Sequence, residues 1–172
     1  MKLEKCTVKQ FDEIKTFYWD VIDGMKDAEY SPAWTKGIYP TEEYLLDCLQ
    51  KGTLYALKDG DTIAAAMVVN SNCNDGYAGT KWNVDTDKVR VIHILAVAGE
   101  YLQQGIGTRM VKEAISLSQE YDVIRLDVLK GNIPASKLYE GMGFKLIRVA
   151  NMYYEDTGWT DYLLYELDLK RK

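Results

Sequence analysis

The stretch HILAVAGEYLQQGIGTRMV, residues 93–111, decides the fold of this chain because its character changes twice along its length. Its first residues complete the apolar, β-branched segment 89–97, which predicts a central strand buried on both faces. A polar loop then leads into Gly105 and Gly107. From Val111 onward apolar residues recur at helical spacing. The stretch therefore predicts a buried strand, a loop and an amphipathic helix that begins near Gly107.

The two glycines predict a binding site for a phosphate-bearing ligand. The first backbone N–H groups of a helix have no internal partner and carry a partial positive charge, and glycine lets an anion approach them closely. A Gly-x-Gly pair alone is weak evidence, because such a loop can simply turn a corner. Two commoner phosphate loops do not fit. A dinucleotide fingerprint needs a small residue at Met110 and a tighter turn, and a P-loop needs Gly-Lys-Ser/Thr.

The segments on either side of this stretch predict alternating helices and strands. Periodicity, turn signals and capping residues mark the boundaries of each element. The predicted order is a strand at 3–6, a helix from 10 to about 25, a helix from Thr41 to Gly52, a hairpin turning at 59–61, the strand at 89–97, the helix from about 107, a strand at 123–129, a short helix at 134–142, and strands at 144–149 and 159–169. Residues 71–87 are polar and predict a connection. The result is an α/β (α+β) fold, a mixed sheet with helices on its faces, in a single domain over residues 1–172.

Composition favours a folded globular protein with no charge bias toward polyanions. Of 172 residues 47% are hydrophobic and 27% charged, and the formal net charge is -5. This composition is too apolar for general disorder. The mild acidity argues against a nucleic-acid or anionic-membrane surface.

The cysteines and the apolar runs point to a cytoplasmic protein. Cys6, Cys48 and Cys73 are odd in number and widely separated, so neither a disulfide framework nor a metal site is expected. The first fifteen residues mix charges and lack an apolar signal segment. No apolar run approaches the length of about 18 residues that a membrane span needs.

A second motif follows the Gly-x-Gly helix and makes the Gly-x-Gly pair more informative. Residues 132–144 are NIPASKLYEGMGF. Together with the strand, loop and helix before it, this pattern resembles the GNAT superfamily of N-acetyltransferases. Its cofactor region commonly has Q/R-x-x-G-x-G/A followed by N-x-x-A-x-x-x-Y-x-x-x-G-F. The second part matches at Asn132, Ala135, Tyr139, Gly143 and Phe144. The resemblance is specific from about residue 91 to 144, and the order of elements extends it over most of the chain.

The resemblance implies a GNAT-type, mostly antiparallel sheet with helices on both faces, and acetyl-CoA as co-substrate. The Val97 N–H would lie near the thioester carbonyl, where it could stabilise an oxyanion. Leu102 stands where the family usually has Gln or Arg, so a side-chain contribution to phosphate binding is lost there. The residues implied for cofactor binding are Leu95, Ala96, Val97, Gln103, Gln104, Gly105, Ile106, Gly107, Thr108, Asn132, Ala135, Ser136 and Tyr139.

Two side chains are implied for catalysis. Tyr139 is the candidate acid that protonates the departing thiolate, although a helix tyrosine can also be an ordinary core residue. His93 is the one histidine of the sequence. Strand alternation predicts it on the same face as Leu95 and Val97, and H-x-L-A-V resembles the strand of arylalkylamine acetyltransferases in which a histidine is linked to removal of the amine proton. A buried structural histidine is the alternative.

The sequence leaves the acceptor open. The pocket would include Trp34, Tyr39 and either Tyr153 or Tyr154, but the loop around Trp34 could equally pack on the surface. The favoured function is transfer of an acetyl group from acetyl-CoA to a primary amine of a small molecule, by direct attack in a ternary complex. A protein or peptide N-acetyltransferase and a non-catalytic acyl-CoA-binding module are the alternatives. Homodimers are common among such proteins, so a homodimer is compatible with the resemblance.

Overall fold

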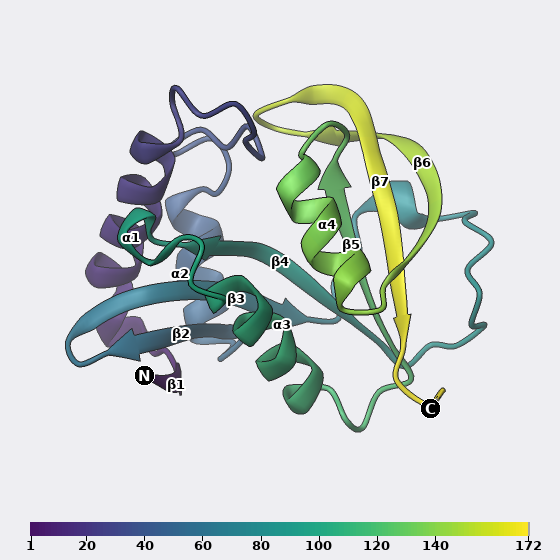
Figure 1. Ribbon diagram of the computed structural model, residues 1–172, viewed down its shortest axis with the longest axis horizontal. Helices are drawn as coiled ribbons and strands as arrows, with labels where there is room; N and C mark the ends of the chain where they lie inside the picture. The colour runs from purple at the N-terminus through teal and green to yellow at the C-terminus, as the bar shows by residue number, and fades with distance from the viewer. Residues whose placement is uncertain (172) are drawn as a thin grey trace.

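The computed structural model describes residues 1–171, which form one seven-stranded sheet in the order β1-β2-β3-β4-β5-β7-β6. The strands and helices follow the predicted order (Figure 1). Their bounds are β1 (Lys2–Lys5), α1 (Phe11–Gly24), α2 (Glu42–Gln50), β2 (Leu54–Asp59), β3 (Thr62–Asn70), β4 (Val89–Val97), α3 (Ile106–Leu117), β5 (Val123–Leu129), α4 (Ile133–Gly141), β6 (Lys145–Tyr154) and β7 (Gly158–Asp168).

The sheet is split between its two central strands. Every neighbouring pair is antiparallel except β4 and β5, which run parallel. These two pair only from Val89–Val91 to Val123–Arg125 and then diverge, leaving a V-shaped opening (Figure 1). The prediction of a mixed, mostly antiparallel sheet is confirmed, and the split gives the sheet a passage from one face to the other.

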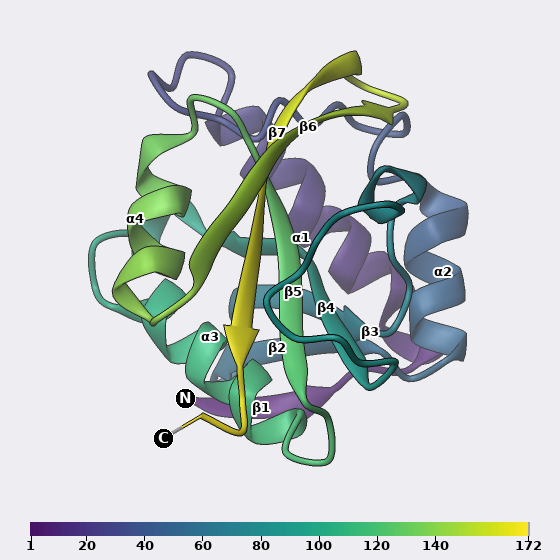
Figure 2. The same cartoon turned by 90° about the vertical axis from the view of Figure 1, so that its right-hand side faces the viewer.

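Helices cover both faces of the sheet (Figure 2). On one face, Met110 and Val111 of α3 and Tyr139 of α4 pack with apolar side chains of β2 to β5 and β7. On the other, Ile14 of α1 and Leu45 of α2 pack on β2 to β4. Each helix buries its apolar stripe against the sheet, as the helical spacing in the sequence predicts.

A β-bulge in β4 overturns one prediction. Ala66 of β3 pairs with Ala96 and Val68 pairs with His93, so β4 holds one residue more than β3 over this interval, and Ile94 has a φ of 43°. A bulge of this kind shifts the alternation of side chains by one position. His93 therefore lies on the α1/α2 face of the sheet with its partner Val68. The prediction that His93 shares a face with Leu95 and Val97 is wrong.

The bulge is held by a buried hydrogen bond. The hydroxyl of Tyr18, on α1, donates to the carbonyl oxygen of Ile94 at 2.8 Å, and the Tyr18 side chain is fully buried. A carbonyl displaced from the sheet ladder thus finds a partner inside the core. This contact fixes the point at which β4 changes face.

The last hairpin is longer than the sequence predicts. β6 extends to Tyr154 rather than to residue 149. The sequence did not predict this extension because most side chains of β6 are exposed, so an apolar alternation does not mark its end. Its turn into β7 reaches the loop between α1 and α2 (Figure 1), where the rings of Tyr39 and Tyr154 lie 5.0 Å apart between centroids. Two segments that are distant in sequence thereby close over one end of the split.

The described helices lack the combination of length and apolarity that crossing a membrane requires.

Candidate active site

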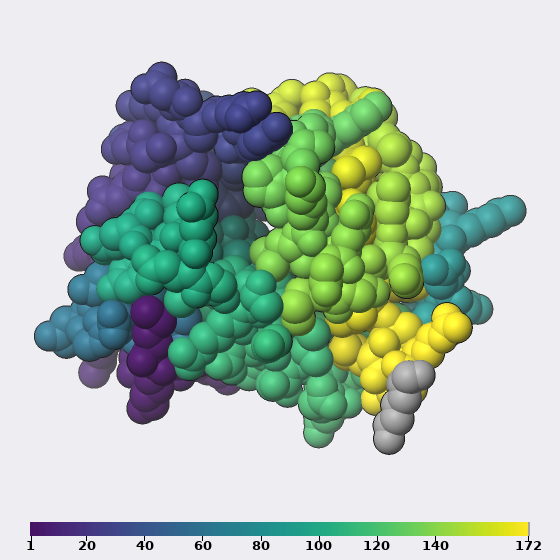
Figure 3. All heavy atoms as spheres, in the orientation of Figure 1, coloured from purple at the N-terminus to yellow at the C-terminus, as the bar shows by residue number. Residues whose placement is uncertain are grey.

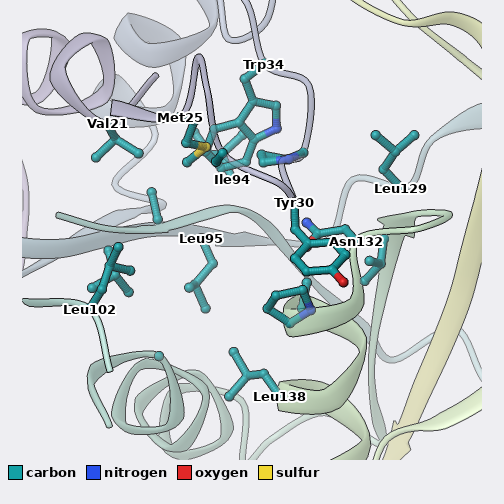
Figure 4. Close-up of a pocket in the computed structure, with 18 of the residues that line it drawn as sticks. Val21, Met25, Tyr30, Trp34, Ile94, Leu95, Leu102, Leu129, Asn132 and Leu138 are labelled. Carbon is teal, nitrogen blue, oxygen red and sulfur yellow. The ribbon is translucent and has the colours of Figure 1, made fainter. Parts of the chain in front are cut away.

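A cavity of about 730 Å³ passes through the split in the sheet. It is lined by β4 and β5, by the loop before α3, by the start of α4, by the end of α1 and by the β6–β7 hairpin. In the space-filling view the surface is hollowed between the N-terminal elements and α4 (Figure 3). The close-up shows Leu95 and Leu138 on one side, with Met25 and Trp34 across from them (Figure 4). The cavity therefore has one end toward α3 and α4 and another toward α1 and the hairpin.

The loop before α3 offers backbone N–H groups to the first end of the cavity. The first hydrogen bond of α3 runs from the N–H of Arg109 to the carbonyl oxygen of Gly105, at 3.0 Å. Before it, the N–H groups of residues 103–108 donate to no backbone group of the described chain. Gly105 has a φ of 75°, a conformation that favours glycine. A run of free amide donors at a helix start suits a pyrophosphate.

Gly107 favours close packing of α3 against α4. A Cβ atom at this position would lie 3.2 Å from Cδ2 of Leu138 on α4. Gly107 therefore lets the two helices that frame this end of the cavity approach each other. The second glycine of the motif thus serves packing as well as access to the backbone.

The main chain of β4 beyond Val91 has no partner on β5. The N–H of Ala98 bonds to the carbonyl of Ala64 and is therefore directed toward β3. Since these groups alternate along a strand, those of Leu95 and Val97 are directed toward the split, where β5 has diverged. This edge can accept an extended ligand as an added strand.

Two polar side chains of α4 face the same end of the cavity. Asn132 is the N-cap residue of α4, but its side chain makes no capping hydrogen bond, and it lines the cavity (Figure 4). Tyr139 also lines the cavity, and its ring packs edge-on against Phe144. Burial, and then the negative charge of Asp127, raise the pKa of Tyr139. The phenol therefore keeps its proton and can act as a donor.

The structure brings nearly all of the predicted site residues to this cavity. Two of them do not line it. The side chain of Gln104 turns back to donate to the carbonyl of Glu100 at 2.9 Å, and Ser136 is buried within α4. The predicted residues that do line it are His93, Leu95, Ala96, Val97, Gln103, Gly105, Ile106, Gly107, Thr108, Asn132, Ala135 and Tyr139.

His93 lines the cavity from the other face of the sheet. Its Nε2 lies 2.8 Å from Oδ1 of Asn70, which also accepts the backbone N–H of Asn72 at 3.0 Å. Because that oxygen is already an acceptor, the neutral imidazole carries its proton on Nε2. Burial lowers the pKa of His93 from 6.5 to about 4, and a backbone hydrogen bond with Asn72 opposes this shift. The imidazole is therefore neutral at physiological pH.

Asp127 of β5 stands across the split from His93, two residues beyond the last paired positions of the two strands. Tyr77 donates to its Oδ2 at 2.7 Å. The hydroxyl of Tyr154 lies 2.9 Å from Oδ2 and 3.1 Å from Oδ1. Burial raises the pKa of Asp127, and the two phenols lower it by less. The phenol donors are arranged to stabilise a carboxylate that water cannot reach freely.

The far end of the cavity combines aromatic rings with a second carboxylate, Asp156 in the β6–β7 turn. Both oxygens of Asp156 are closed to solvent, and no side chain among residues 1–171 donates a hydrogen bond to them. Burial raises the pKa of Asp156, whereas the backbone N–H groups of Asp156 and Thr157 lower it by less. The rings at this end belong to Tyr30, Trp34, Tyr39, Tyr154 and Tyr162.

The sequence predicted part of this end. Trp34, Tyr39 and Tyr154 line the cavity as predicted, whereas the alternative Tyr153 is exposed and pairs with Trp159 outside it. Asp127 was missed, although a lone acid inside the apolar strand VIRLDVL is a signal for a buried charge. Asp156 was missed because an acid in a polar turn is usually solvated, and only the fold brings that turn to the cavity.

A split mixed sheet, with a Gly-x-Gly helix start at one end of the cavity and acidic side chains at the other, fits the class of acyl-CoA-dependent transferases. The family model described as "Acetyltransferase (GNAT) family" matches residues 18–144. The chain belongs to the GNAT acetyltransferase family. The resemblance noted in the sequence is thus confirmed, and membership supports the predicted kind of enzyme, an acetyl-CoA-dependent acyltransferase.

Individual relatives match more distantly. The chain is 36% identical over 73 residues to an N-alpha-acetyltransferase of Saccharolobus solfataricus, a match that covers 40% of this chain and 44% of that protein. It thus spans less than half the length of this curated relative. An acetyltransferase of the GNAT family from Streptococcus agalactiae has a TM-score of 0.82 at 14% identity, over 99% of this chain and 96% of that one. The yncA protein of Salmonella typhimurium, solved with its cofactor acetyl-CoA, has a TM-score of 0.70 at 12% identity, over 99% and 95%.

Proposed function

We propose that this protein transfers the acetyl group of acetyl-CoA to a primary amine of a small molecule, by direct attack within a ternary complex. The observation that carries the proposal is the single cavity through the split sheet. It joins the free amides before α3 at one end to Asp127 and the aromatic rings at the other. A donor and an acceptor can therefore enter from opposite faces and meet between β4 and β5.

The residues on the α3/α4 face fit acetyl-CoA as co-substrate. The amides of residues 103–108 would hold the pyrophosphate, and the free edge of β4 at Leu95 and Val97 would bond the pantetheine amides. The uncapped side chain of Asn132 is available to the same arm. Because these contacts are mostly with the main chain, the loss of a polar side chain at Leu102 is tolerable.

Two groups of the chain would assist the transfer. The amine nitrogen bonds to the acetyl carbon, the carbonyl oxygen gains negative charge, and the N–H of Val97 donates to it. When the carbon–sulfur bond breaks, the sulfur leaves as a thiolate. The Tyr139 hydroxyl gives its proton to this thiolate, and the proton released by the amine restores the phenol through the cavity.

The amine must lose a proton before it can attack, since an ammonium has no lone pair. His93 and Asp127 flank the split where the acceptor would enter. Because its pKa is lowered to about 4, His93 is a weak base that would pass the amine proton on to water in the cavity, while the carboxylate of Asp127 stabilises the ammonium as it arrives. We assign proton removal to His93 and attraction of the ammonium to Asp127.

A protein or peptide N-terminus is the rival acceptor, and the name of the Saccharolobus solfataricus relative favours it. Against it, the Tyr39–Tyr154 contact joins two loops across the far end of the cavity. A peptide needs an open groove in which the chain can continue, whereas an end narrowed by this contact suits a small amine. We therefore favour the small molecule.

The test is calorimetric titration with acetyl-CoA, with ATP as the comparison ligand, followed by assays of CoA release with small amines and with short peptides. We expect saturable binding of acetyl-CoA, much tighter than that of ATP, and release of CoA that depends on the amine. Binding without release for any amine or peptide would support a non-catalytic acyl-CoA-binding module instead. Absence of binding would overturn the proposal.

A further inference from the structure

The acceptor end of the cavity carries negative charge with no positive side chain to balance it. Among the described residues that line the cavity, the acids are Asp20, Asp127 and Asp156, and there is no lysine or arginine. His93 is neutral. A ligand that fills this end therefore meets an uncompensated negative field, which a cation would neutralise and an anion would oppose.

Asp127 and Asp156 occupy different depths in the cavity. Asp127 lies on β5 just beyond the divergence from β4, beside the passage to the α4 face. Its charge contributes to the raised pKa of Tyr139, the proposed acid. Asp156 lies in the turn between β6 and β7, and together with Asp127 it raises the pKa of Tyr39 and Tyr162, whereas it does not contribute to the raised pKa of Tyr139. Asp127 is thus near the reacting end and Asp156 is farther out.

Their hydrogen bonding also differs. Asp127 accepts from Tyr77 and Tyr154. Asp156 accepts from no side-chain donor within residues 1–171, although both of its oxygens are hidden from solvent, and only the backbone N–H groups of its own turn lower its pKa. A carboxylate with hidden oxygens and no side-chain donor is costly, and a cation bound beside it would offset that cost. Asp156, which lacks a side-chain donor, is therefore the better candidate for holding a cation.

Aromatic rings complete the outer site. The ring of Tyr154 lies 5.0 Å from that of Tyr39 and 5.0 Å from that of Tyr162, between centroids. Faces of such rings attract ammonium groups, more strongly where water is excluded. Rings that line the same end of the cavity as this carboxylate form a site that suits an alkylammonium.

We propose that the acceptor is a small diamine, whose reacting nitrogen lies by Asp127 while its second, unreactive ammonium is held by Asp156 among the tyrosine rings. This inference rests on the proposed function and names the substrate class for the same site. The methylene chain between the two nitrogens would lie along the aromatic wall.

The experiment compares acceptors of equal length with different remote groups: 1,4-diaminobutane, n-butylamine and 4-aminobutanoate, each with acetyl-CoA. We expect kcat/KM for the diamine to exceed that for n-butylamine at least tenfold, and 4-aminobutanoate to be the poorest. A series of diaminoalkanes with three to six carbons would then show an optimum length. Equal rates for the diamine and n-butylamine, or faster acetylation of a peptide with an uncharged tail, would overturn the inference.

Variants locate the remote site. Asp156→Asn keeps the shape of the side chain and should lower the diamine-to-monoamine ratio of kcat/KM at least tenfold. Glu155→Gln is the matched control, since Glu155 lies in the same turn but is exposed and does not line the cavity. It should leave the ratio unchanged. If Asp156→Asn leaves the ratio at its original value, Asp156 does not hold the second ammonium.

The outcomes separate this inference from the proposed function. Acetylation of amines without a preference for diamines refutes the inference alone. If no amine releases CoA, the proposed function fails, and calorimetry with 1,4-diaminobutane against n-butylamine decides whether the cation site exists. Tighter binding of the diamine, lost in Asp156→Asn, would support it, and equal binding would refute it.

Discussion

The two faces of the split sheet present different kinds of groups to a ligand. Toward α3 and α4, the groups on offer are mostly main-chain amides, from the loop at residues 103–108 and from the edge of β4. Toward α1 and the β6–β7 hairpin, they are side chains: His93, Asp127, Asp156 and several tyrosines. A main-chain site depends on where glycines and strand ends fall, whereas a side-chain site depends on which distant segments meet. Any chain that places its glycines and strand ends in this way can form the first face, whereas the second requires particular side chains.

The largest effect is expected where the two faces meet. Tyr139→Phe removes one hydroxyl and leaves the ring and its edge-on contact with Phe144. Loss of a general acid should lower kcat by about 100-fold or more, while the affinity for acetyl-CoA, measured by calorimetry, stays within about threefold because the cradle is main chain.

Tyr121→Phe is the control for this change, because Tyr121 lies outside the cavity, with its ring against Arg90. It should leave kcat unaltered. A Tyr139→Phe enzyme with full turnover would remove Tyr139 from catalysis and return it to the core.

The sequence was sufficient for the first face and insufficient for the second. The Gly105–Gly107 pair, the apolar strand 89–97 and the spacing from Asn132 to Phe144 are local patterns, and each corresponds to one element of the structure. The bulge at Ile94 was not predictable, because a single extra residue leaves an apolar strand apolar. It depends on a hydrogen bond from Tyr18, which is 76 residues away. Asp156 reaches the cavity only through the length of the last hairpin.

The next prediction concerns the charge state of the side-chain face. The folded pKa of His93 is about 4, below its ordinary value of 6.5. Between these values the unfolded chain binds the proton more strongly, so the stability is fully present above pH 6.5 and is lost as the pH falls toward 4. From these two values the loss attributable to His93 is up to about 3 kcal/mol.

His93→Gln isolates that contribution, since glutamine can still bond to Asn70 but does not titrate. Urea unfolding of both proteins from pH 7 to pH 4.5 gives the difference in free energy of unfolding at each pH. As the pH falls, the free energy of unfolding of the wild-type protein should decrease more than that of the variant. Parallel curves would contradict a buried, neutral His93. The rate of the wild-type enzyme should likewise show no titration near pH 6.5 from this residue.

A smaller effect is expected from the glycine loop. Gly107→Asp places a carboxylate beside the proposed pyrophosphate and a Cβ 3.2 Å from Leu138. We expect acetyl-CoA to bind about 10- to 50-fold more weakly, a loss of about 1.4–2.3 kcal/mol. Gly107→Asn has the same size without the charge. The difference between the two variants therefore measures repulsion, and their shared loss measures helix packing. If neither variant weakens binding, the phosphate cradle is not at this loop.

The smallest effect tests how completely the main chain accounts for the first face. Leu102 lines the cavity, is 57% exposed, and stands where the family usually has Gln or Arg. Leu102→Gln would add at most one hydrogen bond to the phosphate, worth about 0.5–1.5 kcal/mol, so acetyl-CoA should bind about two- to tenfold more tightly. The exposed leucine supports no core contact, so the melting temperature should hardly change. A gain well beyond tenfold would mean that the amides of residues 103–108 leave the phosphates poorly held. The contrast between a main-chain face and a side-chain face would then fail at residues 103–108, the loop that the sequence predicts most clearly.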